Sequence, residues 1–159
     1  MALVELTIFG IPLILFSAAM LGFFTAYGVG ANDVANAMGT SVGSKVLTIS
    51  QAVLIAAIFE FLGAFFAGGG VTQTIRKGVI DPELFIGQQE ILIYGMISSL
   101  FAAGVWLLVA SIRGWPVSTT HTIVGAIVGF GIYALGSDNI NWTVVGNISL
   151  SWLTSPISS

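Results

Sequence analysis

Long apolar runs, separated by short polar stretches, make up most of the chain. One run extends from Leu3 to Thr25, a second from Val46 to Gly68, and a third, without any charge, from Ile91 to Ile112. Each has the roughly 20 residues that a membrane-spanning helix needs. No Lys or Arg precedes Lys45, so the first run lacks the basic region of a signal peptide. The pattern therefore predicts three membrane spans.

The polar stretches predict connectors and one further helix. The Gly68 to Gly70 run is expected to end the second span, and Thr72 to Glu83 is expected to form a polar connector. Pro116 fits the first turn of a helix that continues to Leu135, and Gly136 to Asn139 has the composition of a turn. The remaining C-terminal stretch is too weakly apolar to predict a full span.

The composition is that of an integral membrane protein. Of the 159 residues, 56% are hydrophobic and only 7% are charged, whereas soluble domains carry about 25% charged residues. The net charge of -3 comes from few groups and there is no basic patch, which argues against nucleic-acid binding. Without cysteine, neither a disulfide nor a thiolate metal site can form. The predicted fold class is all-α, a polytopic bundle of transmembrane helices.

The basic residues do not orient the predicted spans. If each run crosses the membrane once, Lys45 and Arg113 fall on one side, while Arg76 and Lys77 fall on the other. The positive-inside count is therefore tied. A re-entrant segment after Gly28 would change this parity.

The stretch from Gly28 to Lys45 is a long polar run between two apolar ones. Glycines at positions 22, 28 and 30 gather at its start, which predicts a helix break near Gly28 to Gly30. Polar groups held at the depth of a bilayer need partners, and the usual reason for their presence is a ligand or an ion.

Helical periodicity sorts the side chains of this stretch into two faces. With Asn32 set at zero, Asn36 lies near 40°, Thr40 near 80° and Asp33 near 100°, at roughly 100° per residue. The apolar residues fall on the opposite face: Val34, Ala35, Met38 and Val42. Asp33 has no cation within helical reach, so a bound cation or a proton is expected to balance its charge. The alternative is a solvated helix end at the membrane interface.

Glu60 is a second candidate, because it lies near the middle of an apolar run. Its helical neighbours are small: Ala56, Ala57, Gly63, Ala64 and Ala67. Small residues let helices approach closely, so Glu60 is expected to face a helix partner and to hold a proton or an ion. The alternative is a neutral, hydrogen-bonded carboxylic acid with a structural role.

A third candidate is a cluster of hydroxyls and a histidine at the start of the last predicted helix: Ser118, Thr119, Thr120, His121 and Thr122. Free N–H groups at a helix N-terminus, helped by the helix dipole, suit an oxyanion such as phosphate. Hydroxyls are also common capping groups, and Gly125 with Gly129 forms a GxxxG packing motif. Nothing resembles a nucleophile elbow, so a Ser/His hydrolase is not expected and the chain is predicted not to be an enzyme.

Two stretches, GANDVANAMGTSVGSKVLT (Gly30 to Thr48) and PVSTTHTIVGAIVG (Pro116 to Gly129), closely resemble the two motifs of the inorganic phosphate transporter (PiT) family. TQTIRKGVID (Thr72 to Asp81) and SWLTSP (Ser151 to Pro156) are also similar to family stretches, in the same order. The resemblance implies symport of inorganic phosphate, or of a metal phosphate complex, with Na⁺ or H⁺ and with no other cofactor.

By this resemblance, the candidate residues take separate roles. Phosphate binding is expected at Asn32, Asn36, Ser118, Thr119 and Thr120. Cation coupling, including a Na⁺ at Asp33, is expected at Asp33, Asn36 and Glu60. Accessory roles are expected for Thr40 and His121.

Family members are inverted repeats in which both motifs recur, whereas this chain holds one copy of each. Residues 1–159 are therefore expected to form a single membrane domain, the N-terminal half of an inverted-repeat transporter with broken or re-entrant helices. Its expected partners are lipid and either a second half or further copies of itself, in the plasma or inner membrane. Two other functions stay open: a non-transporting membrane protein whose polar residues serve packing, and a cation channel lined by Asp33 and Glu60.

Overall fold

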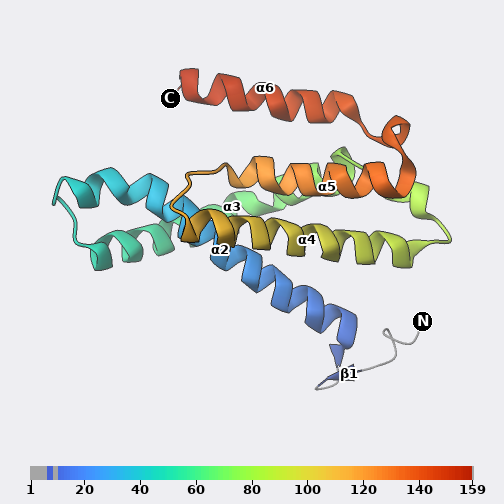
Figure 1. The fold of residues 1–159 in the computed structure, drawn as a ribbon, viewed down its shortest axis with the longest axis horizontal. Helices are drawn as coiled ribbons and strands as arrows, with labels where there is room; N and C mark the ends of the chain where they lie inside the picture. Colours follow the sequence, from blue (N-terminus) through green and yellow to red (C-terminus); the bar gives the residue numbers. More distant parts are fainter. Residues whose placement is uncertain (1–6, 9–10, 159) are drawn as a thin grey trace.

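The computed structural model describes residues 7–8 and 11–158, without the side chains of residues 8, 11, 71–77, 155–156 and 158. It shows a bundle of long helices that follows a short hairpin at the start of α2 (Figure 1). The elements are β1 (Thr7–Ile8), β2 (Ile11–Pro12), α2 (Leu13–Gly43), α3 (Ile49–Gly78), η1 (Pro82–Phe85), α4 (Gln89–Ile112), α5 (Thr119–Leu135), η2 (Ser137–Asn139) and α6 (Trp142–Ser158). Within this part of the chain, three helices are long and apolar enough to cross a membrane: α2, α3 over Ile49–Gly70, and α4. The prediction of three spans in an all-α membrane fold is confirmed.

Helix α2 differs from the predicted first span at both ends. It begins at Leu13 because Pro12 stands at its N-cap and pairs with Thr7 in the hairpin, and the residues before Thr7 lie outside the described part. It then continues without interruption to Gly43, so the predicted break near Gly28 to Gly30 is wrong. In apolar surroundings a broken helix leaves backbone groups without partners, which favours continuity despite the glycines.

Helix α3 also runs further than predicted. Its start is fixed by a capping box in which the Thr48 hydroxyl accepts from the Gln51 amide and the Gln51 side chain accepts from the Thr48 amide. The helix passes through the Gly68 to Gly70 run and ends at Gly78, so most of the predicted polar connector is helical. The same cost of unpaired backbone groups explains why these glycines do not end the helix.

Helices α2 and α4 cross at close range. The Thr25 hydroxyl on α2 donates to the carbonyl oxygens of Leu21, at 2.8 Å, and of Leu100 on α4, at 2.9 Å. Gly104 on α4 lies against Thr25, and Gly28 on α2 lies against Leu107. The missing side chains at Gly28 and Gly104 are what permit this approach. Helix α4 agrees with the predicted span.

Helix α5 lies alongside α4, and α6 forms the outer layer above it (Figure 1). Helices α4 and α5 are joined by the Ser99 hydroxyl of α4, which donates to the Ala126 carbonyl oxygen of α5 at 3.2 Å. Helix α5 begins at Thr119, three residues after the expected Pro116, because the Ser118 hydroxyl caps it by accepting from the His121 amide. The expected end at Leu135 is confirmed, and the predicted turn contains the 3-10 helix η2.

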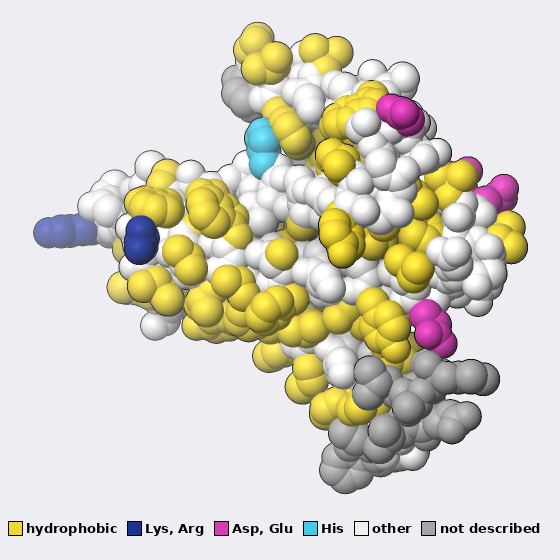
Figure 2. Space-filling view, turned by 45° about the vertical axis from the view of Figure 1, so that its right-hand side comes forward, with side chains coloured by type: hydrophobic (Ala, Val, Ile, Leu, Met, Phe, Trp, Pro, Cys, Tyr) yellow, Lys and Arg dark blue, Asp and Glu magenta, His cyan; other side chains and the backbone are white. Residues whose placement is uncertain are grey.

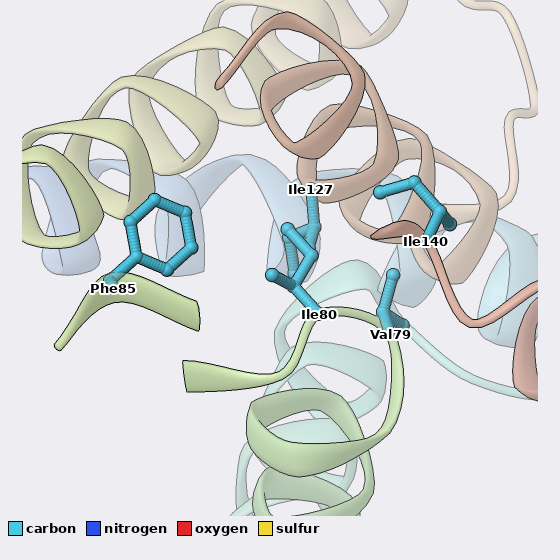
Figure 3. Packing of buried hydrophobic residues seen from close by; sticks show 5 residues of the cluster. All are labelled: Val79, Ile80, Phe85, Ile127 and Ile140. Atoms are coloured by element: carbon cyan, nitrogen blue, oxygen red, sulfur yellow. The ribbon is translucent and has the colours of Figure 1, made fainter. Parts of the chain in front are cut away.

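A buried apolar cluster holds the two connections at one end of the bundle together. Figure 3 shows its members, from the α3–α4 connection, α5 and the segment before α6: Val79, Ile80, Phe85, Ile127 and Ile140. The Asn141 amide also donates to the Val79 carbonyl oxygen at 3.1 Å. These contacts fix the ends of α3, α5 and α6 relative to one another.

Much of the surface is apolar, as expected for a protein surrounded by lipid. On the face in Figure 2, hydrophobic side chains cover the middle, Lys and Arg gather at one end, and Asp and Glu gather at the other. Helix α3 is the most exposed example, since Phe59 and Phe66 are 69% and 79% exposed. A soluble monomer does not leave so large an apolar surface in water, which agrees with a multi-pass membrane protein.

Candidate functional site

The polar residues of α2 form one continuous face, as the helical periodicity predicts. Asn32 is buried, Asp33 is half-buried, and Asn36 and Thr40 are exposed further along the helix. The Asn36 side-chain amide donates to Asn32 Oδ1 at 3.2 Å. The apolar residues predicted for the other face line a groove against the start of α3: Val34, Ala35, Met38 and Val42. The two faces of α2 therefore meet different parts of the molecule.

The loop between α4 and α5 lies against the polar face of α2. Asn32 Nδ2 donates to the Trp115 carbonyl oxygen at 3.0 Å, and the Val117 amide donates to Asn32 Oδ1 at 3.4 Å. The Arg113 guanidinium stacks over the Trp115 ring, 5.0 Å from its centroid. The loop is thus held to α2 by one side chain, and the Arg113 cation is directed onto an aromatic ring.

The N-terminus of α5 meets α2 next to this loop. The Thr119 hydroxyl donates to Asp33 Oδ2 at 3.3 Å. Ser118 caps the helix and is exposed, as are Thr120 and His121. The structure therefore brings together the two stretches that the sequence singled out, although they lie more than 80 residues apart.

Donors and a carboxylate stand side by side at this junction. In the described part of the chain, no group accepts a hydrogen bond from the main-chain amides of Thr119 and Thr120. The His121 amide, in contrast, donates to the Ser118 hydroxyl. No Lys or Arg side chain of the described residues forms an ion pair with Asp33. The site thus offers free N–H and O–H donors at the positive end of a helix, beside an acid without a cationic side chain.

His121 points away from this junction toward α6. Its ring stacks on Trp152, with the ring centroids 3.5 Å apart and the planes tilted by 32°. Trp152 belongs to the SWLTSP stretch, whose sequence gives no indication of a contact with His121. The contact holds α6 against the first turn of α5.

Glu60 is not brought to the site. It is exposed on α3, and the space beside the neighbouring Gly63 is open. Ala56, at one end of this small-residue face, is buried, whereas Glu60 itself is exposed. The described residues therefore do not supply the helix partner expected for Glu60. Glu60 is therefore an exposed acid on α3, separate from the polar face of α2.

The site also contains groups that sequence reasoning missed. Trp115 takes part through its main-chain carbonyl oxygen, and Val117 takes part through its main-chain amide. Almost every residue of a protein carries these two groups. Main-chain groups give no signal in a sequence. Only the position of this loop next to Asn32 shows that they matter.

Comparisons with known proteins give the family. Residues 29–159 match the sequence profile of the Phosphate transporter family. A Haemophilus influenzae protein with phosphate permease in its name is 54% identical over 139 residues, which cover 87% of this chain and 33% of that protein. The chloroplastic inorganic phosphate transporter 2-1 of Arabidopsis thaliana is 51% identical over 145 residues, covering 91% and 25%.

A solved structure agrees with these relatives. A protein titled the sodium-dependent phosphate transporter superposes with a TM-score of 0.85 at 50% identity, covering 90% of this chain and 35% of that one. The chain thus spans between a quarter and about a third of the length of these proteins. The family consists of transporters and not enzymes, which agrees with the resemblance of the two motifs. This chain belongs to the phosphate transporter family.

Proposed function

We propose that this chain provides half of the substrate site of a cation-coupled phosphate symporter. The observation that carries the proposal is the 3.3 Å hydrogen bond from Thr119 to Asp33, which joins the α5 N-terminus to the polar face of α2. It brings anion-binding donors and a carboxylate into one site.

The α5 N-terminus suits the phosphate. Its free amides at Thr119 and Thr120, with the exposed hydroxyls of Ser118 and Thr120, are donors to an oxyanion at the positive end of the helix dipole. Asn36, exposed on the facing helix, adds a side-chain amide. In this arrangement Thr40, exposed further along the same face, has the accessory role.

Asp33 suits the coupling cation. A carboxylate at membrane depth without a paired Lys or Arg needs another positive charge, and Na⁺ supplies one with oxygen ligands. Sodium is favoured over the proton because the matched solved structure is titled sodium-dependent. Glu60 lies apart from Asp33, so a role for it in coupling requires a contact from outside the described residues.

The other half of the site is proposed to come from a second repeat or from another copy of the chain. Repeat transporters place their substrate at the interface between repeats, and the site here is open on one side, with Ser118, Thr120 and Asn36 exposed. We assign the assembly to the plasma or inner membrane, although one relative is named as chloroplastic.

Uptake of radiolabelled phosphate into proteoliposomes tests this function. We expect saturable uptake that an inward Na⁺ gradient drives and that a proton gradient alone does not. Uptake that follows the proton gradient would reassign the coupling ion. The absence of uptake and of phosphate binding, with the chain correctly assembled, would favour a packing role for the polar residues, and a conductance that phosphate does not saturate would favour the channel.

Replacing Thr119 with valine is expected to lower phosphate uptake by roughly tenfold, since hydrogen bonds to charged groups contribute about 1.5–3 kcal/mol. Valine keeps the shape of threonine but cannot donate to Asp33. The rate of uptake at several Na⁺ concentrations measures the effect, and we expect a higher half-saturating Na⁺ concentration. Thr143→Val, on exposed α6, is the matched control and should leave uptake unchanged. Equal Na⁺ dependence in the Thr119 variant and the parent would contradict the role of this bond.

A further inference from the structure

Asn32 differs from its neighbours on the polar face of α2 because its side chain is buried and committed to protein groups. It is 4% exposed. Its nitrogen donates to Trp115, and its oxygen accepts from both Asn36 and Val117. A side-chain amide with these partners has little left to offer a ligand.

The two main-chain groups that Asn32 binds have no other partner in the described part of the chain. The Trp115 carbonyl and the Val117 amide belong to a loop, so neither is satisfied by a helix or by a neighbouring strand. Asn32 bonds to both from one side, much as an adjacent strand would. Without Asn32, these groups would lose their partners at a partly buried position.

The place of this loop gives the contact its significance. Val117 directly precedes Ser118, the cap of α5, so whatever holds Val117 also sets where the helix begins. On the other side, α2 is fixed to α4 through the hydrogen bond from the Thr25 hydroxyl to the Leu100 carbonyl oxygen. Asn32 therefore connects a fixed helix crossing to the donors at the start of α5.

We propose that Asn32 is a positioning residue and not a phosphate ligand: it locks the Trp115–Val117 loop onto α2 and so sets the distance between the α5 N-terminus and Asp33. Its effect on transport rests on the proposed function, whereas the lock is a property of the protein without substrate. Phosphate binding then falls to Asn36 and the α5 donors.

The lock can be measured without phosphate, because the chain contains no cysteine. Val117→Cys introduces a single thiol at a half-buried loop position and leaves the main-chain bond to Asn32 in place. Its reaction with a water-soluble maleimide is followed in proteoliposomes, in buffer free of phosphate. Adding Asn32→Ala is expected to raise the rate by roughly tenfold, since two partly buried groups lose their partner.

Asn36→Ala is the matched control. It removes an amide from the same helix face but no bond to the loop, so the rate at Val117→Cys is expected to stay at the parent value. Asn32→Asp, nearly identical in shape, keeps the acceptor for Val117 but sets an oxygen against the Trp115 carbonyl, and it is expected to raise the rate as well. Ser99→Cys, at a buried site in α4, reports whether a variant has unfolded.

An unchanged labelling rate in both Asn32 variants would overturn the lock, whatever the result for transport. A raised rate in a chain that neither binds nor transports phosphate would support the lock and contradict the proposed function. If Ser99→Cys becomes reactive in the Asn32→Ala background, that variant has unfolded, and the rate in Asn32→Asp decides.

Discussion

Asp33→Asn is expected to lower phosphate uptake by roughly a hundredfold, because a unit charge lost within about 4 Å of a bound cation removes on the order of 3 kcal/mol. Asparagine keeps the size of the side chain and still accepts the hydrogen bond from Thr119. The loss therefore isolates the charge from the packing. Initial rates of radiolabelled phosphate uptake under a fixed Na⁺ gradient measure it.

Glu83→Gln is the matched control for this variant. It removes another carboxylate, exposed in the connection before α4 and at the end of the bundle away from the site, so uptake is expected to stay at the parent rate. Wild-type uptake in Asp33→Asn would show that no coupling cation depends on this acid. That result would contradict the proposed role of Asp33 in binding the coupling cation. It would not contradict the proposed binding of phosphate by the donors of α5.

Gly104→Ala is expected to destabilise the helix bundle by about 1–3 kcal/mol, through overpacking at the crossing of α2 and α4. A β-carbon at this position would lie 2.6 Å from Phe24 Cε1 and 2.9 Å from Thr25 Oγ1, closer than van der Waals contact allows. The Phe24 ring and the Thr25 hydroxyl must then shift, or the helices must separate, and either change disturbs the packing at the crossing. The free energy of unfolding in mixed micelles, followed by tryptophan fluorescence during titration with SDS, gives the value.

Gly125→Ala serves as the comparison, because the space beside Gly125 is open in the described part of the molecule. Alanine favours a helix over glycine by about 1 kcal/mol, so this variant is expected to be as stable as the parent or more stable. Similar destabilisation by both substitutions would show that backbone effects, and not the crossing, explain the result at Gly104.

The sequence predicted the parts of the fold that depend on local pattern. The uncharged run at Ile91 to Ile112 corresponds to α4 because twenty or more apolar residues have few other stable arrangements in a membrane. The shared face of Asn32 and Asn36 follows from the helical period, and their hydrogen bond confirms it. Neither inference needed information about another segment.

The errors arose where the surroundings override a local preference. Glycines at 28, 30 and 68–70 indicate breaks in water, yet α2 and α3 continue through them, since apolar surroundings penalise every unpaired backbone group. The start of α5 was placed at Pro116 by the preference of proline for a first turn, but the Ser118 hydroxyl supplies a true cap two residues later.

The contacts within the site could be expected only through the family resemblance. Asp33 and Thr119 are separated by 86 positions, and no local rule pairs residues across two helices and a loop. The hydrogen bonds between Asn32 and the loop could not be predicted for another reason, because their partners on the loop are main-chain atoms. The described residues leave Glu60 exposed, because a small-residue face shows where a helix can pack and not whether one does.

The unbroken course of α2 makes the two sides of the site unequal in their response to mutagenesis. Every main-chain amide near Asn32 is used inside the helix, so α2 presents only side chains to the site, and each of these can be removed by substitution. Helix α5 presents main-chain donors as well, which persist when a hydroxyl is deleted. Scanning mutagenesis will therefore rank α2 positions above α5 positions even if both helices contribute equally. Only a change that shifts or caps the start of α5 will reveal the contribution of its backbone.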